Sequence, residues 1–221
     1  MSYSVLLIGA TGSLGISIAK KLAKYKSQLS RVAFLTAAGD STPEKEARYK
    51  LIPLERVVGD FRDPETYRGF DILISAVNNK ALLDQIDYFE AAFNGGVKHI
   101  YPSECKFIYV LYYSKKKQKN HLVNYWSHPI VGTDPRNPVA SEESFIQVKI
   151  QVRKALEESV ARRKDSSLGY TYVMTGIFSD FMIESNLLGI SEDKKTARFI
   201  GEPNVLLTAT HTEEYVFLSH V

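Results

Sequence analysis

The sequence predicts an α/β fold built on a doubly wound parallel sheet, and three observations carry that prediction. Short β-branched runs alternate with helical patterns through the first hundred residues, which is typical of a parallel sheet covered by helices. The run FDILISA (residues 70–76) is apolar on both faces, as expected of a central parallel strand. A glycine-rich turn, GATGSLG (residues 9–15), joins the first predicted strand to the first predicted helix.

The remaining elements follow this alternation along the chain. Strands are predicted at residues 5–8, 32–35, 55–58, 70–76, 97–101 and 169–174. Helices are predicted at residues 13–25, 81–93 and 141–163, with a further helix-like start at 213–218. Helix 81–93 is followed by Asn94-Gly95-Gly96, a C-cap signal. Residues 103–140 fit no regular element.

The glycine-rich turn is the strongest functional signal. Its residues are Gly9, Ala10, Thr11, Gly12, Ser13, Leu14 and Gly15. In this strand–turn–helix context the first glycine permits the tight turn, the second lets the backbone approach a phosphate, and the third lets the helix pack closely. The helix N-terminus then offers N–H groups to an anion. We therefore predict a Rossmann-type unit that binds the pyrophosphate of NAD(P). The alternative is a glycine-rich turn that holds no ligand.

The choice between NAD and NADP depends on the residues after the second strand. A carboxylate there favours NAD, and an arginine favours NADP, but the sequence at that point is Thr36-Ala37-Ala38. The loop beyond supplies polar and cationic groups that could surround a phosphate or simply be solvated. These are Ser41, Thr42, Lys45 and Arg48. We favour NADP as the cofactor without excluding NAD.

A lysine on the apolar stripe of helix 141–163 is the main catalytic candidate. The stripe consists of Phe145, Val148, Val152, Leu156 and Val160. At about 100° per residue, Lys149 falls in the middle of it. Its amine is either desolvated, which lowers its pKa toward values useful in proton transfer, or extends past the stripe to water. The position alone does not decide between the two.

Other catalytic patterns are weaker. Tyr113 and Lys117 have the Tyr-x-x-x-Lys spacing of short-chain dehydrogenases, but Tyr112 and Lys116 match equally well and no helical pattern supports either pair. Cys105 has no histidine placed to activate it. The five histidines show no metal-ligand spacing, so no metal site is expected.

Taken together, these segments resemble the NmrA-like family of atypical short-chain dehydrogenases, which includes isoflavone reductases. The similarity, closest to fungal members, extends over most of the chain. It rests on the segments LLIGATGSLG, VGDFRDPETYRGFDILISAV, VKHIYPSE, FIQVKIQVRKALEE and GYTYVMTGIFSDF. The resemblance implies that Lys149 is the catalytic base and that Lys45 contacts NADP. The family's arginine after the second strand is absent, and residues 105–137 do not follow the family pattern.

We expect residues 1–175 to form the NAD(P)-binding domain, with an irregular insertion at about 105–140. Residues 176–221 would form a partial substrate lobe. The single cysteine, the net charge of +3 and the lack of long apolar runs favour a cytoplasmic protein that binds neither nucleic acid nor membrane.

The resulting functional prediction is an NAD(P)H-dependent oxidoreductase that acts on a small aromatic or carbonyl substrate. Two alternatives stay open at this point. One is a non-catalytic NAD(P)-sensing regulator that acts through a protein partner. The other is a truncated, inactive copy.

Overall fold

The computed structural model describes residues 2–104, 144–173, 177–180, 191, 193, 195–196 and 209–211. By compactness the chain divides into two units. One comprises Met1–Glu104 and Val148–Val173, and the other comprises Cys105–Gln147 and Met174–Val221.

The first unit contains a six-stranded sheet in which every neighbouring pair is parallel. Its strands are β1 (Ser4–Ile8), β2 (Arg31–Thr36), β3 (Glu55–Val58), β4 (Ile72–Ser75), β5 (His99–Tyr101) and β6 (Gly169–Tyr170). The spatial order is β3-β2-β1-β4-β5-β6. This order reverses between β1 and β4, which is the arrangement of a Rossmann fold. The predicted fold class is therefore confirmed.

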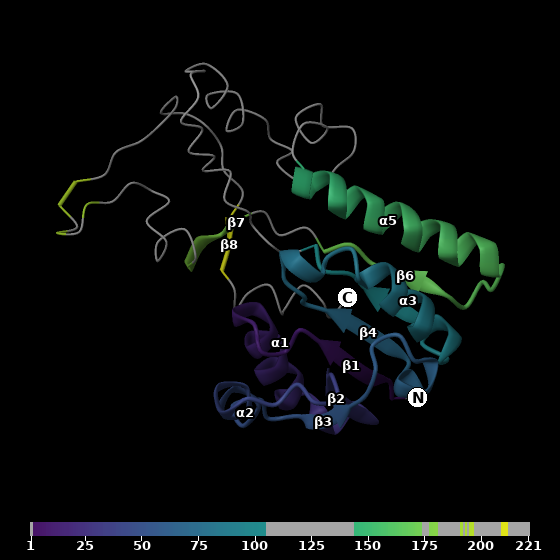
Figure 1. Cartoon of the computed structure of the whole chain (residues 1–221), viewed down its shortest axis with the longest axis horizontal. Coiled ribbons are helices and arrows are strands. Elements are labelled where there is room, and N and C mark those ends of the chain that lie inside the picture. The colour runs from purple at the N-terminus through teal and green to yellow at the C-terminus, as the bar shows by residue number, and fades with distance from the viewer. Residues whose placement is uncertain are drawn as a thin grey trace, which may run out of the picture. The chain divides into compact units, whose positions relative to one another are not determined.

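Within the residues that the structure describes, α-helices accompany the strands of the sheet (Figure 1). They are α1 (Ser13–Lys24), α2 (Pro43–Tyr49), α3 (Gln85–Asn94) and α5 (Ser144–Arg163). Short 3₁₀ turns lie at Lys26–Gln28, Pro64–Tyr67 and Asn79–Ala81. In the second unit, β7 (Ile177–Phe178) pairs in parallel with β8 (Ala209–Thr210).

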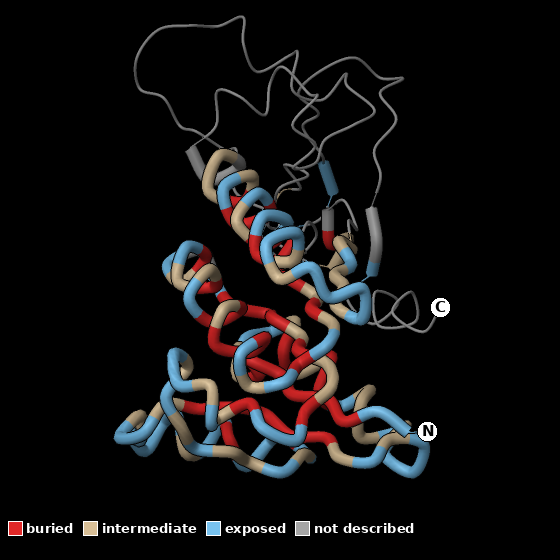
Figure 2. Tube along the Cα trace, turned by 90° about the vertical axis from the view of Figure 1, so that its right-hand side faces the viewer, coloured by how far each residue is buried: buried red, intermediate tan, exposed pale blue. Residues whose placement is uncertain are grey.

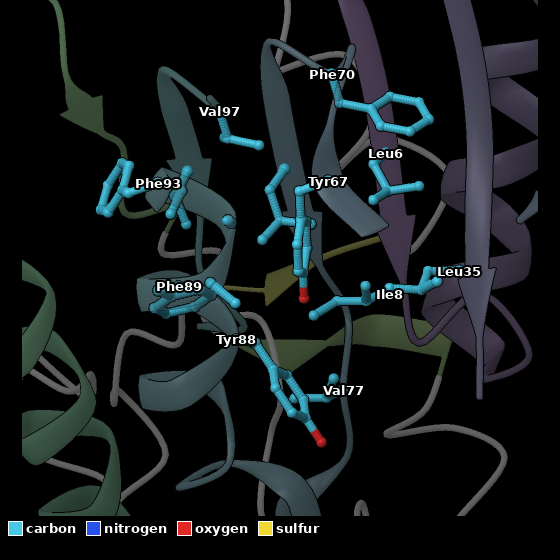
Figure 3. Packing of buried hydrophobic residues seen from close by; sticks show 14 of the residues in the cluster. Leu6, Ile8, Leu35, Tyr67, Phe70, Val77, Tyr88, Phe89, Phe93 and Val97 are labelled. Atoms are coloured by element: carbon cyan, nitrogen blue, oxygen red, sulfur yellow. The ribbon is translucent and has the colours of Figure 1, made fainter. Parts of the chain in front are cut away.

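Alternate residues of each strand face opposite sides of the sheet, and the main core lies on the side covered by α3 and α5. Strands β1 and β2 are buried along almost their whole length, whereas Figure 2 shows that α5 is buried along only part of its surface. Phe89 and Phe93 of α3 pack with Tyr67 and with Leu6 and Ile8 of β1 (Figure 3). On the other side, α1 buries Ile18 and Ala19.

Several element boundaries differ from the sequence prediction. Helix α2 was not expected, although Thr42 accepts a hydrogen bond from the Lys45 backbone N–H and Pro43 occupies the first turn. Both are ordinary helix-start signals. Helix α3 begins at Gln85 rather than at residue 81, because Asn79–Ala81 forms a 3₁₀ turn instead. The predicted helix at residues 213–218 lies outside the described residues.

Candidate nucleotide-binding site

The glycine-rich turn lies where the strand order of the sheet reverses. Gly9 has a φ of +79°, which favours glycine, and a Cβ atom there would lie 2.5 Å from the backbone carbonyl of Ala76, just after β4. A Cβ atom on Gly15 would lie 2.2 Å from the Gly9 carbonyl oxygen. These contacts show that Gly9 and Gly15 allow the turn, β4 and α1 to pack together. They match the reasons for which glycine was predicted at the two positions.

Gly12 has different surroundings. A Cβ atom there would meet only the Gly9 carbonyl oxygen, at 3.5 Å, an ordinary contact distance. Packing within the described chain therefore does not require glycine at this position. Gly12 is the N-cap residue of α1, and the first turn of that helix carries no acidic side chain. The space above Gly12 and the N–H groups of the helix N-terminus fit a pyrophosphate, which needs close backbone approach and positive potential.

A pocket of about 110 Å³ opens beside this turn, over the ends of β1 and β2. The lining residues are Gly9, Ala10, Thr11, Phe34, Leu35, Thr36, Asp40, Tyr49 and Phe61. The pocket is therefore continuous with the predicted pyrophosphate site.

Asp40 is the charged residue that lines this pocket. A turn closed by the hydrogen bond from the Asp40 N–H to the Ala37 carbonyl, with Gly39 at a φ of +76°, returns the chain toward the end of β2. The hydroxyl of Tyr49 donates to Asp40, with its oxygen 3.0 Å from the backbone carbonyl and 3.1 Å from the carboxylate. The hydrogen bond from Lys45 lowers the pKa of the Asp40 carboxyl, so this group is ionised at neutral pH.

The sequence prediction missed Asp40 because it looked for a carboxylate only at residues 36–38 and considered only hydroxyl and cationic groups in the loop beyond them. The signal was present in Gly39, since a glycine three residues beyond a strand indicates a tight turn. Arg56 of β3 was also missed. Its Nε donates to the Thr36 hydroxyl over 3.0 Å, and its guanidinium lies over the Tyr49 ring, 4.0 Å from the ring centroid.

The structure brings none of the residues proposed as phosphate ligands into the lining of this pocket. The Lys45 ammonium forms an ion pair with Asp40. The Thr42 hydroxyl caps α2, and the Ser41 hydroxyl donates to Glu46 over 2.9 Å. Arg48 is exposed.

Lys149 lies on the buried side of α5. The residue is only 3% exposed, and its Nζ donates to the backbone carbonyl of Glu104 over 2.8 Å. Val152 and Leu156 of the same helix are buried in the main core. Burial, rather than extension to water, is therefore the state of this lysine. Because Glu104 follows β5, the ammonium lies near the carboxyl end of that strand.

A buried ion pair between Arg153 and Glu104 lies next to Lys149. Arg153, one helical turn after Lys149, donates from Nε and from a terminal nitrogen to the two Glu104 carboxylate oxygens, over 2.9 and 3.0 Å. The Arg153 guanidinium also lies over the ring of Tyr172, 4.8 Å from its centroid. The sequence prediction missed this pair, although the spacing of four residues between Lys149 and Arg153 places both cations on one helix face.

Hydrogen bonds of the buried Gln85 connect the ends of β4 and β5. The Gln85 side-chain oxygen accepts from the Ser75 hydroxyl over 2.7 Å and from the Ser103 backbone N–H over 2.9 Å. The Ser103 hydroxyl donates to the Val77 carbonyl over 2.9 Å. The segments that follow these two strands are therefore held together at the edge where Lys149 lies.

The other candidates are not placed by the structure. Cys105 and the two Tyr-x-x-x-Lys pairs lie outside the described residues. Within the described part of the chain, no group of three or more His, Cys, Asp or Glu side chains could hold a metal ion. No helix in that part is long and apolar enough to cross a bilayer.

Comparison with solved structures identifies the fold more closely. Isoflavone reductase is 21% identical, with a TM-score of 0.66 over 99% of this chain and 64% of that protein. The chain has the NmrA-like, isoflavone reductase-like fold. AtPrR2, solved with NADP⁺ and (+)-pinoresinol, shares this fold at 17% identity and a TM-score of 0.61, covering 99% of this chain and 65% of that one.

The chain is also similar in sequence to a fungal protein. The oxidoreductase aprR of Aspergillus flavus is 23% identical over 95% of the chain. The chain spans about 60% of that protein's length. No protein-family profile matches the chain.

Proposed function

We propose that this chain is an NAD(P)H-dependent oxidoreductase of the isoflavone reductase type, acting on a small aromatic or carbonyl substrate. The observation that carries the proposal is the placement of two features on one edge of the sheet. The Gly9–Gly15 turn lies at the point where the strand order reverses, and Lys149 lies at the carboxyl end of β5. Ligands of open α/β sheets bind outside the carboxyl ends of the strands at such a point.

The turn would hold the pyrophosphate with backbone N–H groups of residues 9–15 other than that of Gly12, which donates to the Gly9 carbonyl over 3.2 Å. Gly12 leaves space for a phosphate, and the positive end of α1 stabilises its charge. The adenosine half would enter the pocket beside Thr36 and Asp40. The AtPrR2 structure contains NADP⁺, and Lys45 is the cation that the sequence offers to a 2′-phosphate. In this structure that ammonium is already paired with Asp40.

The nicotinamide, when bound, supplies a hydride. Hydride addition to a carbonyl or conjugated substrate leaves an anionic oxygen or carbon that must gain a proton. The buried Lys149 side chain would supply that proton, or remove one in the reverse direction. Such positioned acid–base groups contribute about 10²–10⁴-fold to a rate.

Glu104 and Arg153 would act as positioning residues for this lysine. Lys149 donates to the Glu104 backbone, and Arg153 fixes the Glu104 side chain with two hydrogen bonds. Bidentate arginine–carboxylate pairs restrict geometry more than single contacts do. The chain after β5 is thereby anchored to α5, which keeps the Nζ atom at the strand end.

The substrate class is proposed from the relatives. AtPrR2 was solved with pinoresinol, a small molecule, and aprR is named an oxidoreductase. We assign residues 1–175 to nucleotide binding and residues 176–221 to part of a substrate lobe.

The test is nucleotide binding followed by turnover. The full chain is titrated with NADH and with NADPH by isothermal calorimetry, and nucleotide oxidation is then measured with a panel of carbonyl and phenylpropanoid substrates. Lys149→Met is expected to reduce turnover at least ~100-fold and to leave nucleotide affinity unchanged. Lys154→Met is the matched control, because Lys154 lies on the same helix with a side chain that is 75% exposed.

Each outcome has a distinct meaning. Failure to bind either nucleotide would overturn the proposal. Unchanged turnover in Lys149→Met would remove this residue from the reaction. Nucleotide binding with no turnover on any substrate, together with capture of a partner only when nucleotide is present, would favour the regulatory alternative.

A further inference from the structure

The pocket at the end of β2 presents a carboxylate where the adenosine ribose of a dinucleotide would lie. Asp40 lines this pocket together with Gly9, Ala10 and Thr11 of the glycine-rich turn. A ligand whose pyrophosphate contacts the turn therefore places its adjoining ribose near Asp40. The pocket and the turn are both formed by residues of the first unit.

Asp40 is held in place from two directions. The tight turn through Gly39 directs the backbone back toward the end of β2. The Tyr49 hydroxyl contacts both the backbone carbonyl and the carboxylate of Asp40. Tyr49 is itself packed against Phe34 of β2, with ring centroids 6.0 Å apart. The carboxylate is thus fixed on the sheet rather than carried on a free loop.

Two cations next to Asp40 and Tyr49 are already paired with carboxylates. The Lys45 ammonium is paired with Asp40, and Arg56 donates to the Glu46 carboxylate over 2.8 Å. Glu46 also accepts from Ser41. These four charged groups sum to zero, and the one that lines the pocket is negative.

We infer that Asp40 is the specificity-determining residue for the nucleotide, and that it selects NAD(H) over NADP(H). A carboxylate accepts hydrogen bonds from the hydroxyls of an unmodified ribose. A 2′-phosphate would bring a charge of about −1.5 to −2 next to the same carboxylate, and like charges in contact disfavour binding. This inference rests on the proposed nucleotide-binding function and deepens it.

The test compares the dissociation constants of NADH and NADPH by isothermal calorimetry at fixed ionic strength, using the full chain. For the unaltered chain we expect NADH to bind at least tenfold more tightly. Asp40→Asn is expected to shift the ratio at least tenfold toward NADPH, because the charge is lost and Lys45 is released. A tenfold shift corresponds to about 1.4 kcal/mol.

Glu46→Gln is the matched control. It removes the same charge from the same cluster, but Glu46 does not line the pocket, so the nucleotide ratio should change less than threefold. Thermal unfolding of each variant establishes that it is folded. Should Asp40→Asn not fold, Tyr49→Phe takes its place, since it releases the carboxylate and should move the ratio in the same direction.

The results separate this inference from the proposed function. If neither nucleotide binds the unaltered chain, the proposed function fails and this inference with it. If both bind but NADPH is preferred, or if the ratio is the same in Asp40→Asn, only the role of Asp40 is overturned. A shift of equal size in Glu46→Gln would also overturn it, because the effect would then be one of overall charge.

Discussion

Gly9, Gly12 and Gly15 lie in one turn, yet an added side chain would meet different surroundings at each of them. At Gly9 and Gly15 a Cβ atom would overlap backbone atoms, at 2.5 and 2.2 Å. At Gly12 it would reach only an ordinary contact of 3.5 Å. Since backbone cannot move aside as a flexible side chain can, Gly9 and Gly15 are required by the fold. Gly12 is required only if a ligand approaches.

This difference leads to a prediction with paired substitutions. Gly15→Ala should lower the free energy of unfolding by about 1–3 kcal/mol, the usual cost of overpacking. Gly12→Ser should leave stability unchanged or slightly raised, because serine is a better N-cap than glycine, but should weaken nucleotide binding at least tenfold. Urea unfolding and calorimetric titration measure the two effects. Full nucleotide affinity in Gly12→Ser would show that the pyrophosphate does not lie there.

At the scale of the elements, α3 and α5 are joined side by side by ion pairs as well as by apolar packing (Figure 1). Glu90 of α3 accepts from Arg162 over 2.8 Å and from Arg163 over 2.7 Å. Partial burial raises the pKa of Glu90, but the hydrogen bonds from Arg163, Ser159 and Arg162 and the charge of Arg163 together outweigh it, and the pKa falls from 4.5 to about 2. Arg163 also donates to Asn94 over 2.8 Å, so one guanidinium contacts two positions of α3.

The lowered pKa of Glu90 predicts an acid-sensitive contribution to stability. Because the folded-state pKa lies below the unfolded value, this contribution is complete above about pH 4.5 and is lost as the pH falls toward 2. The Glu90 side chain is 34% exposed, so solvent screening limits the contribution to roughly 1 kcal/mol. In Glu90→Gln, urea unfolding should show lower stability at pH 7 and a smaller loss between pH 5 and pH 2.

Glu158→Gln is the control for this experiment. Glu158 lies on α5 and faces Lys154 at 3.9 Å, with a side chain that is 64% exposed. Its substitution should leave the pH dependence of unfolding as it is in the unaltered chain. A Glu90→Gln variant with the unaltered acid profile would show that this carboxylate does not titrate as described.

At the scale of the whole molecule, the nucleotide-binding unit is assembled from two separate stretches of the chain, Met1–Glu104 and Val148–Val173. The second stretch contributes β6 to the edge of the sheet and most of α5 to its face. The proposed site draws on both stretches, with the glycine-rich turn in the first and Lys149 in the second. Occupation of the site should therefore stabilise the unit as a whole.

The corresponding prediction concerns thermal stability. A nucleotide present at 100 times its dissociation constant, and bound only by the folded chain, adds about 2.7 kcal/mol to the free energy of unfolding. For a chain of this size the melting temperature should rise by about 5–10 °C. Calorimetric scans with NADH, NADPH and an equal concentration of inorganic phosphate measure the shift. An equal shift with phosphate alone would count against dinucleotide recognition.

Local sequence patterns determined the elements and the glycine-rich turn of this protein. Strand alternation, the apolar central strand and the spacing of Gly9, Gly12 and Gly15 depend on residues close together in the chain, so the fold class and the turn could be predicted. The position of Lys149 on the apolar stripe of its helix was also visible. Whether its side chain is buried was not, because that depends on what packs against the helix.

The tertiary structure decided the contacts between residues far apart in the sequence. Glu104 and Arg153 meet only because α5 packs beside β5. Gln85 reaches both Ser75 and Ser103 because the start of α3 lies at the ends of β4 and β5. Asp40 enters the pocket through a turn whose direction depends on Gly39 and on Tyr49 of the next helix. Side-chain periodicity identifies which face a residue occupies, but the partner on that face is set by packing. The proposed choice between NAD(H) and NADP(H) depends on the position of Asp40, which is set by its contact with Tyr49.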